Sequence, residues 1–198
     1  MKWKIAFLLV LIITISVLYA EAEGIREWFQ LTETTATPAP NAFRFRDGIR
    51  WGMNKQQVKA LETEPMTERS MQNWSVMFTD GKVIVSRFTA DLVFMFREDK
   101  LMMISYEFPQ EPPDSFQYLT GALSYLYGEK TESEPLKIKA LMDAINPNRY
   151  RIDLITQAAE WTNEDGTAVY LYYFTENDFA ITYVSPEMAI RIYQTNGL

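Results

Sequence analysis

The side chains that could do chemistry in this chain are limited by two absences. Its 198 residues include no histidine and no cysteine, which removes imidazole bases, thiol nucleophiles, Ser-His-Asp triads, disulfides and almost every zinc site. An enzyme of this composition would have to work through carboxylates, lysine, serine or tyrosine, and a pair of acids of the glycosidase type is the one plausible arrangement. We therefore expect no catalytic residue, no metal and no cofactor, with a carboxylate-dependent hydrolase acting on carbohydrate as the alternative.

The acidic residues do not form a recognisable site in the sequence. Asp91 interrupts an apolar stretch, but an acid at the start of a strand usually faces solvent or bonds a turn. Glu107 and Glu160 lie on alternating strands and need no special role. The cluster Asn163-Glu164-Asp165 lacks the alternating oxygen ligands of an EF-hand loop. Solvated turns and strand faces account for all of these side chains.

Three aromatic residues, Trp51, Tyr170 and Tyr172, are the candidates for a binding surface. Side chains alternate along the run Tyr170 to Phe174, so one set packs the core and the other could stack on a sugar or peptide. The two tyrosines would serve this role only if their face of the sheet is open. For Trp51 we expect burial, whereas an exposed indole would anchor a partner.

The stretch from Phe43 to Glu62 positions Trp51 and organises the domain. It predicts a strand, a turn at Gly52 and a helix. Asn54 is a suitable N-cap, and Gln57 can complete a capping box with it. Val58 and Leu61 then give the helix its apolar edge.

A family resemblance covers Gly52 to Leu61, which begins Gly-Met-Asn-Lys-Gln-Gln-Val. This run is similar to the helix start of SmpA/OmlA-like small envelope lipoproteins and of β-lactamase-inhibitor-protein-like domains. The resemblance implies short helices packed against an antiparallel sheet and a role in binding proteins. The chain departs from the lipoprotein pattern, since Leu61-Glu62-Thr63-Glu64-Pro65 replaces Leu-Gly-x-Pro and no cysteine can carry a lipid. No function is transferred residue by residue.

The remaining elements predict an α+β fold with an antiparallel sheet and short helices on one face. Strands fill Trp74 to Phe108, with a hairpin at Asp80-Gly81 and a turn at Glu98-Asp99. A helix starts with Asp114 as its cap and ends at Gly128. The later predicted elements are a helix at Leu136–Ile145, strands at Ile152–Trp161, Thr167–Phe174 and Phe179–Val184, and a helix at Pro186–Tyr193.

The domain organisation begins with a signal peptide over residues 1–22. Lys2 and Lys4 precede an apolar run from Ile5 to Leu18, and Ala20-Glu21-Ala22 provides small residues for cleavage. Residues 23–42 form an N-terminal segment and a Thr/Pro linker, and residues 43–198 form one α+β domain. This domain could consist of two pseudo-repeated lobes, 43–110 and 111–198.

These features predict a noncatalytic, secreted or envelope-associated interaction module whose partner is another extracytoplasmic protein. The formal net charge of −7 argues against binding to nucleic acid or to an anionic membrane surface. Contact with the membrane would come only from an uncleaved signal sequence. Its apolar run is shorter than the roughly 20 residues that cross a bilayer.

Overall fold

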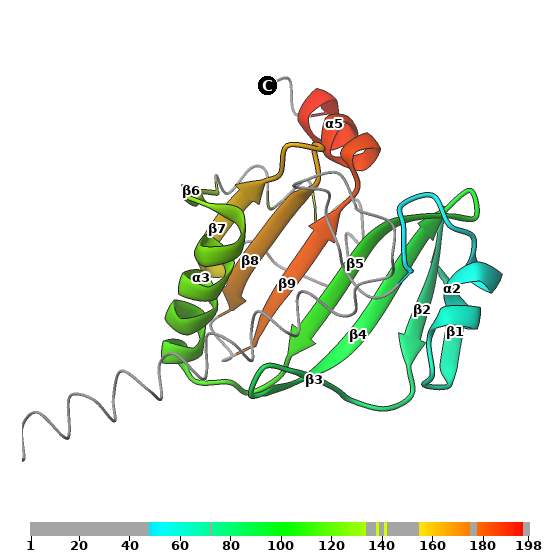
Figure 1. Ribbon diagram of the computed structural model, residues 1–198, viewed down its shortest axis with the longest axis horizontal. Helices are drawn as coiled ribbons and strands as arrows, with labels where there is room; N and C mark the ends of the chain where they lie inside the picture. Colours follow the sequence, from blue (N-terminus) through cyan, green and yellow to red (C-terminus); the bar gives the residue numbers. More distant parts are fainter. Residues whose placement is uncertain are drawn as a thin grey trace, which may run out of the picture.

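The computed structural model describes residues 48–71, 73–133, 138, 141, 155–174 and 178–195. Within these residues the strands form one antiparallel sheet of nine strands, and the α+β class is confirmed (Figure 1). The elements are α2 (Lys55–Leu61), β1 (Met66–Met71), β2 (Trp74–Thr79), β3 (Val83–Val85), β4 (Phe88–Arg97), β5 (Lys100–Phe108), α3 (Pro113–Tyr127), β6 (Thr131–Glu132), β7 (Ile155–Thr162), β8 (Ala168–Phe174), β9 (Phe179–Val184) and α5 (Pro186–Thr195).

The order of the strands divides the sheet into two halves. From one edge to the other the order is β1-β2-β4-β5-β9-β8-β7-β6, and β3 pairs with β4. The central pair is β5 and β9, which run antiparallel from Met103↔Val184 to Phe108↔Phe179. Each half starts with a helix, α2 or α3, and continues with antiparallel strands. The predicted lobes 43–110 and 111–198 thus share one sheet, and their origin by duplication stays a prediction.

The central strands of the sheet are buried on both faces. On what we call the first face, Phe94 of β4 and Ile181 of β9 pack with Val58 of α2 and Leu123 of α3. On the second face, the residues that alternate with these along the strands, such as Met95 of β4 and Ala180 of β9, pack with α5. The second-face cluster includes Met95, Met103, Ile138, Leu141, Tyr170, Tyr172, Val184, Met188 and Ile192. Burial on both faces explains why β4 reads as a nearly continuous apolar run.

The helices differ from the prediction that they share one face. Figure 1 shows α3 lying across β7 and β8, whereas α5 stands at the end of the sheet beyond β9. Ser185 turns the chain onto the second face, because its amide donates to Met102 and its hydroxyl accepts the amide of Met188. The apolar spacing of Met188 and Ile192 then places their side chains in the second-face core.

One local prediction about the strands was wrong. The Asp80-Gly81 turn does not join a hairpin, because β3 pairs with β4. The long strand β4 pairs with β2 between Val93 and Arg97 and with β3 between Phe88 and Ala90, so both neighbours share one edge. β1 was not predicted from the sequence, and it pairs with β2 along its whole length.

The start of α3 also differs from the prediction. The N-cap is Pro112, which makes no side-chain capping bond, so Asp114 lies in the first turn instead of capping the helix. Pro113 can begin a helix because the first amides need no intrahelical partner. Gly128 ends the helix at φ +87° as predicted.

Several predicted segments fall outside the described residues. They are the signal peptide, the linker, the strand start at residues 43–47 and most of the helix at 136–145, of which Ile138 and Leu141 are described as helical and buried. None of the helices in the described ranges is long and apolar enough to span a bilayer.

Candidate functional site

One end of the sheet gathers the β1–β2 turn, the β4–β5 turn and the segment that precedes α2 (Figure 1). Backbone bonds fix this arrangement, since the Gly52 amide donates to Leu101 at 3.0 Å and the Leu101 amide donates to Met53 at 2.8 Å. Gly52 has φ +81°, which only glycine adopts easily. The segment predicted to organise the domain is therefore attached to the start of β5.

The predicted start of α2 is confirmed in detail. Asn54 accepts the Gln57 amide and Gln57 accepts the Asn54 amide, both at 2.9 Å, which is a complete capping box. Val58 is fully buried, whereas Leu61 is 45% exposed and contributes less to the core than expected. The predicted strand at Ile49–Trp51 is instead an irregular segment leading into a turn.

Trp51 lies half-buried against the first-face core. Its indole Nε1–H donates to Thr167 Oγ1 at 3.0 Å, and the Thr167 hydroxyl donates to Asp165 at 3.1 Å. Thr167 belongs to the β7–β8 turn in the other half of the chain, so this chain of bonds joins the two halves. Trp51 thus combines packing with a long-range polar contact.

Tyr170 and Tyr172 lie in the interior, with exposed fractions of 0% and 2%. The Tyr172 hydroxyl bonds Thr182 Oγ1 at 2.8 Å, and Thr182 bonds Ser105 at 3.0 Å. The alternation predicted for β8 is correct, but the second face is covered and offers these rings no contact with solvent. The structure does not bring the three predicted residues together, because Trp51 packs on the first face and both tyrosines on the second.

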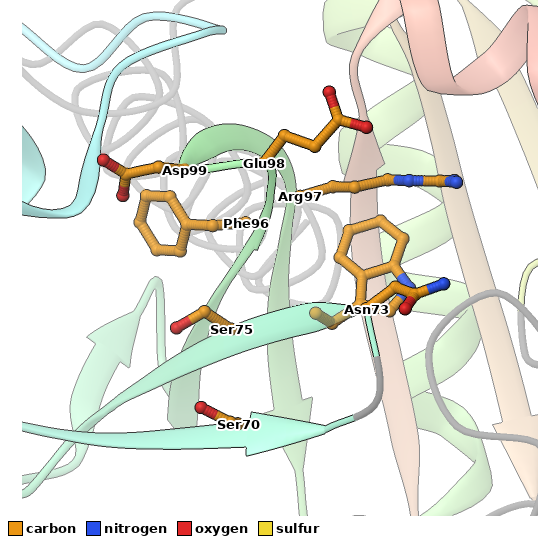
Figure 2. A pocket seen from close by; sticks show the side chains of 8 residues that line it. Ser70, Asn73, Ser75, Phe96, Arg97, Glu98 and Asp99 are labelled. Atoms are coloured by element: carbon orange, nitrogen blue, oxygen red, sulfur yellow. The ribbon is translucent and has the colours of Figure 1, made fainter.

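A hollow at the hairpin ends, which we call the hairpin hollow, has a volume of about 540 Å³. It is shown in Figure 2. Its walls come from the ends of β1, β2 and β4 and from the β4–β5 turn. The lining residues are Ser70, Asn73, Trp74, Ser75, Phe96, Arg97, Glu98 and Asp99.

Strand register explains how these side chains are distributed. Ser70 pairs with Ser75, and Ser75 pairs with Phe96, which sets these three side chains in one row across β1, β2 and β4. Arg97 pairs with Trp74 and points to the opposite side. Figure 2 agrees, with Ser70, Ser75 and Phe96 leaving in one direction and Arg97 in the other. The hollow therefore wraps around the end of the sheet.

The turn that closes the hollow is strained. Glu98 and Asp99 have φ values of +52° and +58°, in the left-handed region that residues other than glycine rarely adopt. A two-residue hairpin turn with positive φ at both positions matches the twist of its strands and usually contains Asn-Gly or Asp-Gly. Placing two acids there costs conformational energy, a feature often found at functional sites.

A charged network next to the hollow connects α2 with β1 and β2. Lys55 Nζ donates to Glu68 of β1, and the Ser75 hydroxyl donates to the same Glu68 oxygen at 2.8 Å. Lys59 Nζ lies 3.8 Å from the other carboxylate oxygen. The hydrogen bond from Lys55, followed by that from Ser75, lowers the pKa of Glu68, and the bond to Glu68 raises the pKa of Lys55.

The side chains that line the hollow are polar, charged and aromatic. Glu98 and Asp99 leave one turn in different directions in Figure 2, whereas a glycosidase pair flanks its substrate across a cleft. Asp91 lies outside the hollow and is ion-paired to Lys82. Within the described ranges, no three acidic side chains gather to hold a metal ion.

The hollow could not be predicted from the sequence because β1 was not predicted. Thr67 to Ser70 are all exposed and polar, so the strand shows no apolar alternation. The Gln72-Asn73 pair between two short runs was the signal that could have indicated the hairpin. Comparisons with known protein families, with curated proteins and with solved structures find no match to this chain.

Proposed function

We propose that this chain is a noncatalytic interaction module that binds another protein outside the cytoplasm. The observation that supports the proposal best is the hairpin hollow, an open concave surface held by three strands and a strained turn. A rigid scaffold that presents polar and aromatic groups on turns is the usual design of a recognition surface.

The composition of the hollow favours a protein as the ligand. It combines Arg97 with the small hydroxyl residues Ser70 and Ser75, and arginine side chains are enriched at protein interfaces. The net charge of −7 disfavours nucleic acid. The leader-like residues 1–22 support a partner in the cell envelope or the secreted fraction.

The test is capture of a partner by the full chain from envelope and secreted fractions. We expect Glu98→Lys to reduce capture, because it reverses a charge at the hollow. Lysine is also a long, unbranched side chain, so we expect the backbone of the turn to keep its conformation. Glu132→Lys is the matched control, since Glu132 is also exposed but lies on β6 at the opposite edge of the sheet. Equal capture by both variants would remove the hollow from the proposal. Failure of the wild-type chain to capture any protein saturably would overturn the proposal itself.

A further inference from the structure

Strand β1 forms an open edge of the sheet beside the hairpin hollow. Among the described strands, β2 is the only partner of β1. The four residues from Thr67 to Ser70 are exposed, and Ser70 also lines the hollow. An exposed edge strand offers a row of backbone donors and acceptors to another chain.

The register shows which backbone groups of β1 face this edge. In an antiparallel pair, residues that exchange hydrogen bonds alternate with residues that do not. The Asp80 amide donates to Pro65 at 2.8 Å, directly beyond the Met66↔Thr79 pair. Counting from this bond, Thr67, Arg69 and Met71 direct their backbone groups to β2. Met66, Glu68 and Ser70 therefore direct theirs outward.

The charges on β1 disfavour pairing between two copies of this chain in the registers that are centred on its charged residues. Two copies related by a two-fold axis and joined into one sheet would place identical residues opposite each other at the centre. A pairing centred on Glu68 sets glutamate against glutamate, and one centred on Arg69 sets arginine against arginine. Like charges directly opposite each other on adjacent strands are destabilising.

The same charges favour a different occupant. Glu68 already has Lys55 and Lys59 as partners on the first face. Arg69 lies on the other face, exposed, with its guanidinium 5.7 Å from the Phe78 ring centroid. An added strand with an acidic side chain beside Arg69 would complement this edge, since opposite charges on adjacent strands attract.

We propose that the β1 edge binds an extended segment of the partner protein as an added strand, with an acidic side chain beside Arg69 and one end of the segment at the hairpin hollow. The proposal rests on the proposed function and states how the partner is held. Backbone bonds to Met66, Glu68 and Ser70 would supply affinity, and the hollow would select the side chain that enters next to Ser70.

The test begins with a displayed library of random linear peptides of about ten residues, the upper length of ordinary strands, selected on the full-length chain. Amide hydrogen exchange then compares the free chain with the chain bound to a selected peptide. We expect new protection at Glu68 and Ser70, and little change at Thr67 and Arg69, whose amides are already bonded to β2. Methylating single backbone nitrogens of the peptide should weaken binding about tenfold at every second position, where the amide faces β1, and should have little effect at the positions between them.

A pair of variants tests the same edge from the side of the protein. Ser70→Pro removes an outward amide without removing a bond to β2, and Ser70→Ala is the control for loss of the hydroxyl. We expect Ser70→Pro alone to lose peptide binding by about tenfold or more. If Ser70→Pro does not fold, the exchange pattern of the wild-type chain still decides.

The outcomes separate this inference from the proposed function. If selection yields no peptide, or peptides without alternating protection, strand addition at β1 is overturned. If Glu98→Lys reduces partner capture while Ser70→Pro does not, the hollow binds the partner without an added strand. If neither variant changes capture of the natural partner, strand addition at β1 is overturned and the hollow is removed from the proposed function, which then depends only on saturable capture by the wild-type chain.

Discussion

At the scale of single residues, Trp51 does more than fill the core. It packs beside Val58 on the first face, and its indole reaches Thr167 across 116 positions of the chain. Thr167 is fully buried, and Asp165 accepts both its amide and its hydroxyl. Packing holds the indole in place, and Asp165 holds the Thr167 hydroxyl in place. We therefore expect this hydrogen bond to contribute measurably to stability.

We predict that Trp51→Ala destabilises the chain by less than the about 3–5 kcal/mol typical of a fully buried tryptophan, because Trp51 is only partly buried. The contribution of the hydrogen bond between Trp51 and Thr167 to stability can be measured with Trp51→Phe, Thr167→Val and the double variant. We expect the two single changes to be coupled by about 0.5–1.5 kcal/mol, the net value of one hydrogen bond. Denaturant melts measure this coupling, and strict additivity would show that the bond contributes nothing.

The predicted tyrosines show what alternation along a strand can and cannot establish. It correctly separated Tyr170 and Tyr172 from Leu171 and Tyr173. Alternation does not say whether the second set meets solvent or another layer. That answer depends on α5 and on Ile138 and Leu141, which are distant in sequence from β8.

At the scale of elements, the capping box of α2 was predictable because its signals lie within four residues. We predict that Asn54→Ala destabilises the chain by about 0.5–2 kcal/mol, since the first-turn amides lose their side-chain acceptor. Gln56→Ala, at an exposed position of the same helix, is the control and should be nearly neutral. Thermal or denaturant melts compare the two variants, and equal effects would contradict the capping role.

The contact between α2 and β1 predicts a dependence of stability on pH. Because the folded state lowers the pKa of Glu68, its contribution is present above the ordinary glutamate pKa of about 4.3 and is lost as pH falls through the lower folded value. The raised pKa of Lys55 keeps the lysine contribution constant until pH exceeds about 10.4.

We therefore expect the stability difference between wild type and Glu68→Gln to be constant from about pH 5 to pH 10 and to shrink below about pH 4. Glu129→Gln, a change at an exposed residue after α3, is the control. Urea melts at a series of pH values measure the difference. A difference that persists unchanged to pH 3 would exclude Glu68 as its source.

Elements defined by local signals were predicted better than their pairing. Helices with caps and strands with apolar runs, such as α2, β4 and β9, lie close to the predicted positions. β1 was missed because an edge strand buries few side chains. β3 pairs with β4 because β4 is long enough to extend beyond β2. The residues around Asp80-Gly81 do not indicate that length.

At the scale of the whole molecule, two tyrosines mark the place where α3 packs on the central sheet. Tyr183 of β9 is buried in the first-face core, and Tyr127 of α3 packs partly buried against the same core. Desolvation by burial raises the pKa of both phenols. A pKa that is raised on folding stabilises the protein below the ordinary tyrosine value of about 10, and this stabilisation is lost as pH rises beyond it.

We predict that the free energy of unfolding falls steeply above about pH 10 and that this fall is shallower in Tyr183→Phe. Tyr125→Phe, at a residue 67% exposed on the same helix as Tyr127, is the control. Phenolate absorbance followed together with circular dichroism gives both quantities. Ionisation of all tyrosines well before unfolding would contradict the burial of Tyr183.

The candidate site is a property of the whole molecule, because it forms where turns from separate hairpins meet. The hollow combines the β1–β2 turn with the β4–β5 turn. No residue spacing in the sequence predicts that Ser70 and Asp99 line the same surface. The composition predicted only that binding is more plausible than catalysis.

The most direct test of the proposed interaction places a photo-reactive amino acid at position 73 or position 125 of the full chain, in the cells that produce it. Asn73 is exposed at the rim of the hairpin hollow, and Tyr125 is exposed on α3. We predict that illumination yields a single discrete cross-linked species from position 73 and little or none from position 125. Cross-links from position 125 alone, or none from either position, would contradict a partner at the hollow.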